Sequence, residues 1–317
     1  MQPLIAEGRE QPKQRIKVRP EKHTMDKAKT YPRECGAAVR HSDGDGWLVF
    51  REPVSVIEAE YPSEAIRVIA EAESFVEQQG GYAVGFLTYE AAPGMDPAMA
   101  TVARPSDSPP CAWFGLFRSV EHVPALGDAG REEAGYTLEE WCPSIDRNTY
   151  TKALSRIHDY IAAGDTYQVN FTMRLRSRFT GEPFELFRAL DTAQRGRYSA
   201  FIHTGTLSIC SASPELFFDL AGHTLISKPM KGTAARGLSS ESDKEMADWL
   251  RHSAKNQAEN LMIVDMIRND MGRIARRGTV RVPALFETER YPTLWQMTST
   301  VQAETSASVS EIFEAMF

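Results

Sequence analysis

Alternating apolar and polar positions mark several short segments of this chain as strands. These segments are rich in β-branched and aromatic residues, and turn-forming residues bound most of them, as in the strands of globular proteins. The predicted strands are 46–52, 54–57, 82–90, 112–120, 167–179, 199–204, 207–212, 215–220, 223–227, 279–289 and 293–303. Residues 228–233 are expected to form a loop.

Apolar residues at helical spacing predict helices in the intervening segments. Ile66, Ile69 and Phe75 share one face of a helix that Pro62 opens and Gly80 ends. Further helices are expected at 149–163, 183–194, 241–252, 255–272 and 308–317. Because the strands come in neighbouring runs with few βαβ alternations, the predicted fold class is α+β, with large, sandwich-like antiparallel sheets flanked by helices.

The charge distribution separates the start of the chain from the rest. Residues 1–33 hold nine Lys or Arg and four Asp or Glu, a balance of +5 in a chain whose formal net charge is −7. We interpret 1–33 as a basic disordered arm, 34–145 as an N-terminal region and 146–317 as the region that carries the chemistry. The acidic body repels phosphate, which argues against a nucleic-acid role.

Composition places the protein among soluble globular proteins. The 317 residues are 42% hydrophobic and 25% charged. No stretch approaches the roughly 18 to 20 unbroken apolar residues of a membrane-spanning helix, and the chain begins without a secretory signal. Cys35, Cys111, Cys142 and Cys210 are far apart in the sequence and are interpreted as free core thiols in a reducing cytosol, so we expect a cytoplasmic protein.

Common catalytic and metal-binding motifs are absent from the sequence. It contains no GxxxxGK[ST] phosphate loop, no HExxH, no GxSxG elbow and no cysteine–histidine cluster. Their absence argues against a P-loop enzyme, most classes of hydrolase and a structural zinc protein.

Glu215 is the first of three residues that could carry chemistry. It lies in a turn between two apolar strands, where desolvation could raise the pKa of its carboxyl group and allow it to act as an acid. The alternative is a solvated turn glutamate.

Lys231 is the second, in the segment PMKGT (229–233). Proline fixes the entry to the turn, and glycine allows the backbone to approach a ligand closely. The lysine could pair with an anion or, as a neutral amine, act as a nucleophile; the alternative is a basic surface turn.

Glu259 is the third, just before the apolar stretch of a predicted helix. A carboxylate together with water and substrate oxygens is a usual way of holding Mg²⁺. The alternative is a surface ion pair between Lys255 and Glu259, four residues apart on the helix.

Taken together and in order, the motifs resemble those of the chorismate-utilising enzymes. They are GDTYQVN (164–170), SPE (213–215), PMKGT (229–233), AEN (258–260) and DMIRNDMGR (265–273). This family includes anthranilate synthase component I, aminodeoxychorismate synthase component I, isochorismate synthase and salicylate synthase. The resemblance covers roughly 148–317 and implies the fold of that family.

Two positions indicate a branch of the family. Enzymes of the family that add water have a lysine where this chain has Gln168, so the resemblance implies a branch that uses ammonia. Anthranilate synthases have alanine at the position of Lys231. In this respect the chain resembles the aminodeoxychorismate synthase branch, which has lysine there and supplies p-aminobenzoate for folate. The resemblance therefore implies chorismate as substrate, Mg²⁺ as cofactor and a glutamine amidotransferase subunit as the source of ammonia.

The resemblance also implies roles for individual residues. Lys231 matches the nucleophile that attacks ring carbon 2 of chorismate, and Glu215 matches the acid that protonates the departing hydroxyl. Glu259 matches a residue of the metal site. Gly232 and Thr233 match contacts to substrate oxygen, and Gln168 and Gln296 are also expected to bind substrate.

The sequence departs from the family pattern at two places. Gln296 stands where the family commonly has histidine; glutamine can donate a hydrogen bond but does not titrate near neutrality. The chain ends at Phe317, before the family's GSxTGAPK-type segment. We therefore expect a C-terminally truncated chain that cannot turn over chorismate alone.

Two alternative functions stay open at this point. One is anthranilate synthase component I. The other is non-catalytic, a regulatory fragment that binds an amino acid such as tryptophan.

Overall fold

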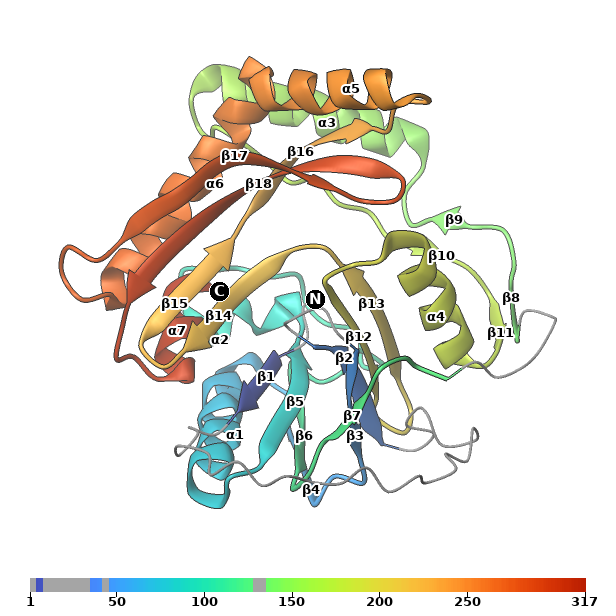
Figure 1. Ribbon diagram of the computed structural model, residues 1–317, viewed down its shortest axis with the longest axis vertical. Coiled ribbons are helices and arrows are strands. Elements are labelled where there is room, and N and C mark those ends of the chain that lie inside the picture. Colours follow the sequence, from blue (N-terminus) through green and yellow to red (C-terminus); the bar gives the residue numbers. More distant parts are fainter. Residues whose placement is uncertain (1–3, 8–34, 42–45, 128–134) are drawn as a thin grey trace. The chain divides into compact units, whose positions relative to one another are not determined.

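The computed structural model describes residues 4–7, 35–41, 46–127 and 135–317 (Figure 1). The chain divides into two compact units. Unit 1 consists of Met1–Gly130 and Phe187–Phe317, and unit 2 consists of Arg131–Leu186. The boundary predicted near residue 145 thus falls inside unit 2.

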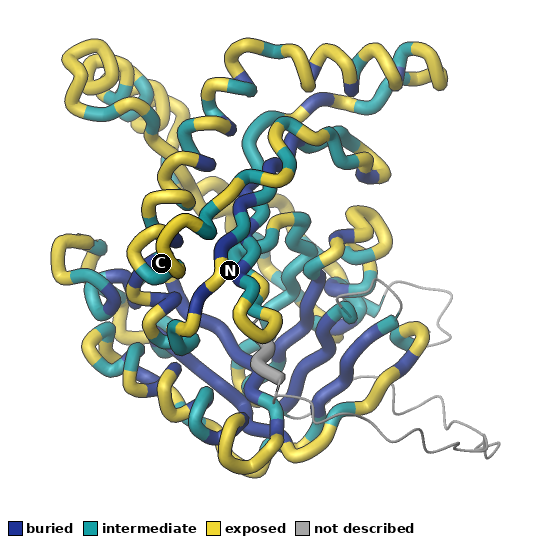
Figure 2. Tube along the Cα trace, turned by 60° about the vertical axis from the view of Figure 1, so that its left-hand side comes forward, coloured by how far each residue is buried: buried dark blue, intermediate teal, exposed yellow. Residues whose placement is uncertain are grey.

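Two antiparallel sheets of unit 1 share an apolar core. The first has the strand order β1 (Leu4–Glu7), β5 (Tyr82–Leu87), β6 (Ala112–Phe117) and β4 (Ser55–Ala59). The second has the order β13 (Ser208–Ser213), β12 (Tyr198–His203), β2 (Gly36–Arg40), β3 (Trp47–Arg51) and β7 (Glu121–Val123). Phe50, Phe86 and Ile202 meet in this core, and Figure 2 shows long buried stretches along these strands.

A third antiparallel sheet carries most of the residues with predicted chemistry. Its order is β14 (Leu216–Ala221), β15 (Thr224–Lys228), β18 (Leu294–Glu304) and β16 (Met230–Ala235), and β17 (Arg281–Arg290) also pairs with β18. Side chains alternate between the two faces of a strand. Met297, Ser299 and Val301 are buried on one face of β18, whereas Gln296, Thr298 and Thr300 lie on the other.

Helices cover the apolar faces of the sheets in unit 1. Leu250 packs with Met297, and Val264 packs with Val301, so α5 and α6 cover the third sheet. The helices are α1 (Ala65–Gln79), α2 (Ala92–Met95), α4 (Pro183–Gln194, which begins in unit 2), α5 (Ser240–His252), α6 (Ala254–Ile274) and α7 (Val309–Met316), with 3₁₀ turns at Pro62–Glu64 and Tyr89–Ala91. Gly80 ends α1 with φ +65°, a conformation that glycine adopts without steric cost.

Unit 2 is built from one long helix and two short strand pairs. Strand β9 (Cys142–Pro143) pairs with β10 (Leu175–Arg176), and β8 (Tyr136–Leu138) pairs with β11 (Phe179–Gly181). Asp146 caps the N-terminus of helix α3 (Arg147–Ala163), and its side chain accepts a hydrogen bond from the Thr149 backbone N–H at 2.6 Å. The helix contains no buried residue, so unit 2 has little core of its own.

The observed elements confirm the α+β class with large antiparallel sheets, and two local predictions were wrong. Residues 167–174 do not form a strand, because no described strand pairs with them; only β10 and part of β11 lie within 167–179. Residues 230–235 form β16 instead of a loop, because β18 supplies hydrogen-bond partners that the local sequence does not reveal. Strand β2, Gly36–Arg40, was not predicted.

The predicted arm falls mostly outside the described residues. Leu4–Glu7 nevertheless forms β1, which pairs with the edge of β5. None of the four cysteines forms a disulfide, as expected, but Cys142 is exposed and therefore not a core thiol. Burial raises the pKa of the Cys210 thiol to about 11.

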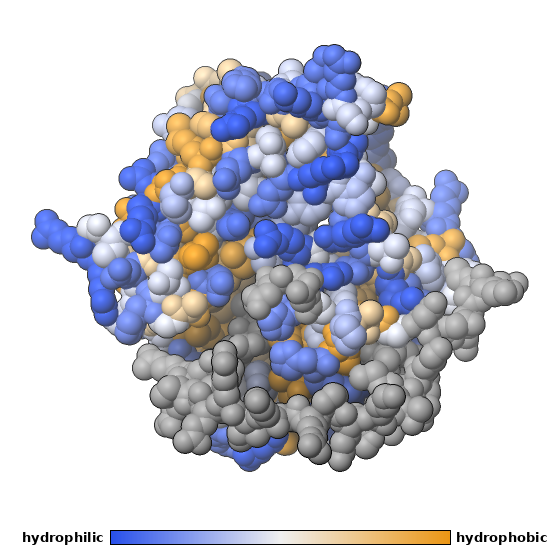
Figure 3. All heavy atoms as spheres, in the orientation of Figure 1, coloured by the Kyte–Doolittle hydropathy of each residue, from blue (hydrophilic) through white to orange (hydrophobic). Residues whose placement is uncertain are grey.

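The face of the molecule shown in Figure 3 mixes hydrophilic and hydrophobic residues, with the two kinds interspersed across it. Among the described residues, no helix is both long and apolar enough to cross a bilayer.

Candidate active site

Lys231 and Gly232 lie in an irregular stretch of the β16–β18 ladder. Met230 is opposite Thr298 and Thr233 is opposite Gln296, but the register shifts between these two pairs, as at a β-bulge. A bulge re-aims the side chains within it, so Lys231 is not constrained to the simple in-and-out alternation of a strand. Lys231 is half-buried.

Gly232 allows the bulge to approach the helices closely. Its φ is +100°, and a Cβ added there would lie 3.1 Å from the Asn256 Cβ and 3.2 Å from the Leu250 Cδ1. The backbone conformation therefore favours glycine, and a larger residue would push against these two side chains. Gly232 thus brings the strand that carries Lys231 close to the start of α6.

Glu215 reaches the same strand from the turn between β13 and β14. Its Oε1 accepts a hydrogen bond from the Met230 backbone N–H at 3.0 Å. Leu216 is opposite Lys228, so the carboxylate extends the β14–β15 ladder by one further contact. The residue is exposed, as the solvated-turn interpretation expected, but its carboxylate is held one residue away from Lys231.

Thr233 and Gln296 form a direct contact on the face of the third sheet opposite α6. The Thr233 hydroxyl donates to the Gln296 Oε1 at 3.1 Å. With its oxygen engaged, the Gln296 side chain retains an NH₂ group that can donate to a ligand. The structure thus places Glu215 at the residue before Lys231 and joins Thr233 to Gln296.

Glu259 lies on α6 and forms the surface pair that was considered as its alternative. Its carboxylate is 3.7 Å from the Lys255 ammonium, and the side chains are 36% and 81% exposed. Because such an ion pair contributes little to stability, the Glu259 carboxylate can exchange Lys255 for another cation. Among the described residues, no cluster of three or more His, Cys, Asp or Glu side chains could hold a metal ion.

Gln168 belongs to unit 2, whereas the residues above belong to unit 1. It lies in a stretch without regular secondary structure, and its carbonyl oxygen accepts a hydrogen bond from the Thr166 hydroxyl at 3.1 Å. Its expected contact with substrate stays a prediction.

Asn260 anchors α6 to β18, a role that the sequence analysis did not assign. Asn260 is fully buried, and its Oδ1 accepts a hydrogen bond from the Ser299 hydroxyl at 2.5 Å. The Ser299 Oγ in turn accepts from the Phe286 backbone N–H at 3.1 Å. The AEN motif was the available signal, because a polar residue follows Glu259 on a helix whose next residues are apolar.

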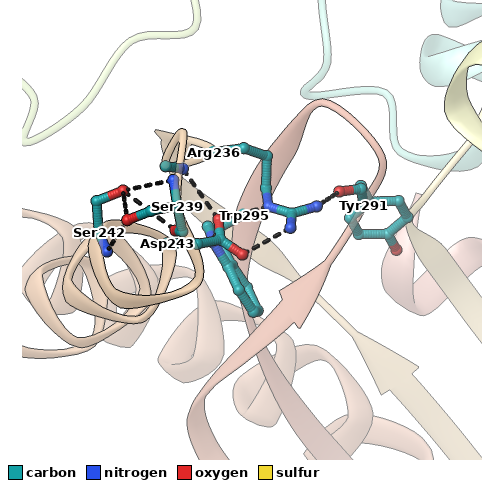
Figure 4. A network of polar contacts seen from close by, with 7 residues as sticks. Arg236, Ser239, Ser242, Asp243, Tyr291 and Trp295 are labelled. Carbon is teal, nitrogen blue, oxygen red and sulfur yellow. Dashed lines mark hydrogen bonds and ion pairs between the residues drawn. The ribbon is translucent and has the colours of Figure 1, made fainter.

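A second unpredicted network fixes the far end of β16 (Figure 4). Arg236 donates twice to Asp243, both at 2.6 Å, and once to the Tyr291 carbonyl oxygen at 2.7 Å. The Trp295 Nε1 donates to the Asp243 Oδ1 at 2.9 Å. The hydrogen bonds from Arg236 hold the pKa of the Asp243 carboxyl group well below its ordinary value. The network ties β16, α5 and the β17–β18 turn together.

A cavity of about 840 Å³ opens beside these strands within unit 1. Lys228, Glu287 and Glu289 contribute to its wall, and Tyr291 is buried there. Burial, together with the nearby Glu289 carboxylate, raises the pKa of the Tyr291 hydroxyl. The remaining lining residues are Thr192, Arg195, Arg197, Arg236, Arg290 and Pro292. With five Lys or Arg and two Glu, the cavity has a positive lining that favours anionic ligands.

Comparison with known proteins identifies relatives of the chain. The family described as chorismate binding enzyme matches residues 28–317. Aminodeoxychorismate synthase component 1 of Klebsiella aerogenes is 38% identical over 187 residues, which are 58% of this chain and 42% of that protein. Anthranilate synthase component 1 of Thermus thermophilus is 39% identical over 158 residues, 50% of this chain and 34% of that protein. The matches thus cover less than half the length of these curated relatives.

Solved structures share the fold. Anthranilate synthase component I from Streptococcus pneumoniae gives a TM-score of 0.68 at 18% identity, covering 96% of this chain and 75% of that one. An isochorismate synthase from Bacillus anthracis gives 0.67 at 16% identity, covering 91% and 74%.

Proposed function

This chain belongs to the family of chorismate-binding enzymes, and we propose that the protein carrying it is aminodeoxychorismate synthase component I. In this proposal it converts chorismate and ammonia into 4-amino-4-deoxychorismate, the precursor of p-aminobenzoate. Relatives bearing that name, 33–38% identical, support this branch. The observation that supports the proposal is the 3.0 Å hydrogen bond from the Met230 backbone N–H to Glu215, because it holds a carboxyl group at the residue that precedes Lys231.

Two displacements describe the proposed reaction. In the first, the Lys231 amine forms a bond to ring carbon 2 of chorismate, the two conjugated ring double bonds shift, and the hydroxyl on carbon 4 leaves. Glu215 supplies the proton with which this hydroxyl departs as water. In the second, ammonia bonds to carbon 4, the two double bonds shift back, and the Lys231 amine leaves carbon 2. An enzyme amine thereby divides one difficult substitution into two easier ones.

The polar side chains on β16 and β18 bind and orient the substrate in this scheme. Thr233 fixes Gln296 by their 3.1 Å hydrogen bond, which directs the Gln296 NH₂ group toward a substrate oxygen. Gly232 is proposed to offer backbone groups of the bulge to a substrate oxygen, and its close packing on Asn256 and Leu250 holds that bulge in place.

Glu259 is the residue that would hold Mg²⁺. Its carboxylate is accessible and is engaged only weakly by Lys255, and Mg²⁺ is commonly held by one or two carboxylates together with water and substrate. When bound, the ion would neutralise a substrate carboxylate.

Ammonia is proposed to come from a glutamine amidotransferase subunit. The relatives are named as component 1, which supports an enzyme of two components. Free ammonium would replace the partner in vitro.

Anthranilate synthase component I is the second candidate, because a Thermus thermophilus protein of that name is 39% identical to part of the chain. The product separates the two functions. The protein is incubated with chorismate, Mg²⁺ and ammonium, and the products are resolved by chromatography. The proposal expects an amino product that yields p-aminobenzoate only after a lyase is added. Fluorescent anthranilate together with pyruvate would contradict it.

A further inference from the structure

The cavity of unit 1 gathers cationic side chains that no protein group neutralises. Arg195, Arg197 and Arg290 line it, and among the described residues none of their guanidinium groups makes a hydrogen bond or an ion pair. The ammonium group of Lys228, on the same wall, has no ion pair within the described part of the chain either. Because like charges repel, a group of cations at one place is stabilised when an anion binds among them.

The two carboxylates in the lining do not cancel this charge. Glu289 accepts a hydrogen bond from the Tyr291 hydroxyl at 3.0 Å, and Glu287 is exposed on the same strand. Neither glutamate forms an ion pair with a described residue. The fifth cation, Arg236, is already paired with Asp243, which lies outside the lining. Four cations without an ion pair and two glutamates therefore leave the lining with a surplus of two positive charges.

The turn that carries Arg195 and Arg197 is held against β13. Gly196, between them, is buried, and a Cβ added there would lie 2.8 Å from the Ser213 carbonyl oxygen. Arg195 has φ +48°, a left-handed conformation in which arginine is strained and glycine is not. The chain thus keeps a cation at this point at the expense of backbone strain, which indicates a function for the side chain.

Arg290 is fixed in a similar way at the end of β17. It is opposite Trp295 in the β17–β18 ladder. The next residue, Tyr291, is bonded through both of its backbone groups: its N–H donates to the Leu294 carbonyl oxygen at 2.9 Å, and its carbonyl oxygen accepts from Arg236 at 2.7 Å (Figure 4). Two fixed turns therefore present three arginines to the cavity, and guanidinium groups bind a carboxylate or phosphate through paired hydrogen bonds.

We propose that this cavity is a second binding site of the protein, for a small dianion, a dicarboxylate or a phosphate ester, held by the three arginines. Two negative charges match the surplus of positive charge in the lining. The volume of about 840 Å³ lies within the usual range for a small-molecule site. The site is separate from the one to which the proposed function belongs, because Glu215, Lys231 and Gln296 do not line it.

Titration calorimetry with inorganic phosphate and with malonate, at neutral pH and constant ionic strength, tests the proposal. We expect one of these dianions to bind once per chain, and the one that binds more tightly identifies a phosphate or a dicarboxylate as the ligand. Arg290→Gln is expected to raise its dissociation constant about tenfold or more, because hydrogen bonds to a charged group are lost. Arg281→Gln is the matched control. It removes the same charge from the exposed far end of β17, outside the cavity, and should keep the dissociation constant within about twofold.

Further variants separate this site from the candidate active site and from effects on folding. Because the Arg290 guanidinium has no partner among the described residues, Arg290→Gln is expected to keep or raise the melting temperature, and Arg195→Gln should weaken dianion binding to a similar extent. Lys231→Gln removes a charge from the candidate active site and should leave dianion binding unchanged. The proposal is overturned if the unaltered protein binds neither dianion, if Arg290→Gln and Arg281→Gln bind equally well, or if Lys231→Gln abolishes binding. None of these results depends on turnover of chorismate, so the proposed function can fail while this site stands.

Discussion

The Glu215 carboxylate accepts a hydrogen bond from the backbone N–H of Met230 at 3.0 Å. The turn before β14 and the start of β16, which the β14–β15 hairpin separates in the sequence, thereby meet immediately before Lys231. The contact is made by Oε1, and a carboxyl group has a second oxygen that can carry a proton. This arrangement suits an acid that must be held near a nucleophile and still exchange a proton with a substrate.

Glu215→Gln tests the acid directly. The glutamine amide oxygen can still accept the Met230 hydrogen bond, so the turn is preserved, but the amide cannot deliver a proton to the departing hydroxyl. We expect kcat to fall by about 10²- to 10⁴-fold with little change in KM, because the proton transfer is lost and binding is not. Steady-state kinetics measures both. A rise in KM at unchanged kcat would assign Glu215 to binding instead.

Gly232→Ala tests the bulge. An alanine at this position must adopt a φ of +100°, and its Cβ would crowd Asn256 and Leu250. The expected loss is about 1–3 kcal/mol in the free energy of unfolding, together with weaker chorismate binding. Urea denaturation measures the first and calorimetry the second.

Gly222→Ala provides the matched control for this substitution. Gly222 has φ +62°, but nothing lies within 4 Å of an added Cβ. Alanine at position 222 would therefore be strained in its backbone without being crowded, and the chorismate affinity of this variant should not change. Equal effects of the two substitutions on binding would show that the close approach at Gly232 is not needed.

The sequence predicted the sheets and helices well where the pattern was local. Helix α1, with its apolar face and its terminal Gly80, follows directly from helical spacing. Strand β16 did not, because its hydrogen-bond partners come from β18, about 60 residues later. Conversely, 167–174 alternates as a strand does, but alternation cannot create a ladder without a neighbouring strand.

The candidate site was predictable to the extent that motifs carry it. Glu215, the segment 231–233 and Gln296 lie far apart in the sequence, and only the family resemblance grouped them. Hydrogen bonds such as Ser299–Asn260 depend on the distance between a strand and a helix, which no local pattern specifies.

Ser299→Ala is expected to destabilise the protein. The substitution removes the hydrogen bond to the buried Asn260 Oδ1 and the acceptor of the Phe286 N–H. Leaving such groups unsatisfied costs about 1–3 kcal/mol each. Urea denaturation should therefore show a clear decrease in the free energy of unfolding. Ser306→Ala, at an exposed position, is the control and should stay within about 0.5 kcal/mol of the unaltered protein. Similar values for both substitutions would contradict the anchoring role.

Asp243 makes stability sensitive to acid. Its carboxyl pKa is lowered in the folded state by the hydrogen bonds from Arg236, so its contribution is complete above the ordinary pKa of about 4 and is lost as the pH falls below that value. We expect Asp243→Asn to lower the melting temperature at neutral pH and to reduce the further loss between about pH 4 and pH 2. Thermal unfolding followed across this range provides the comparison. Parallel curves for the two proteins would show that Asp243 does not cause the acid sensitivity.

The covalent role of Lys231 is the central claim, and mass spectrometry of the protein quenched with chorismate and Mg²⁺ in the absence of ammonia tests it most directly. The account predicts an adduct on the peptide that contains Lys231, discharged when ammonium is added, retained in a Lys228→Ala control and absent from Lys231→Ala. An unmodified Lys231 peptide, together with 4-amino-4-deoxychorismate formed by Lys231→Ala at the original rate, would contradict it.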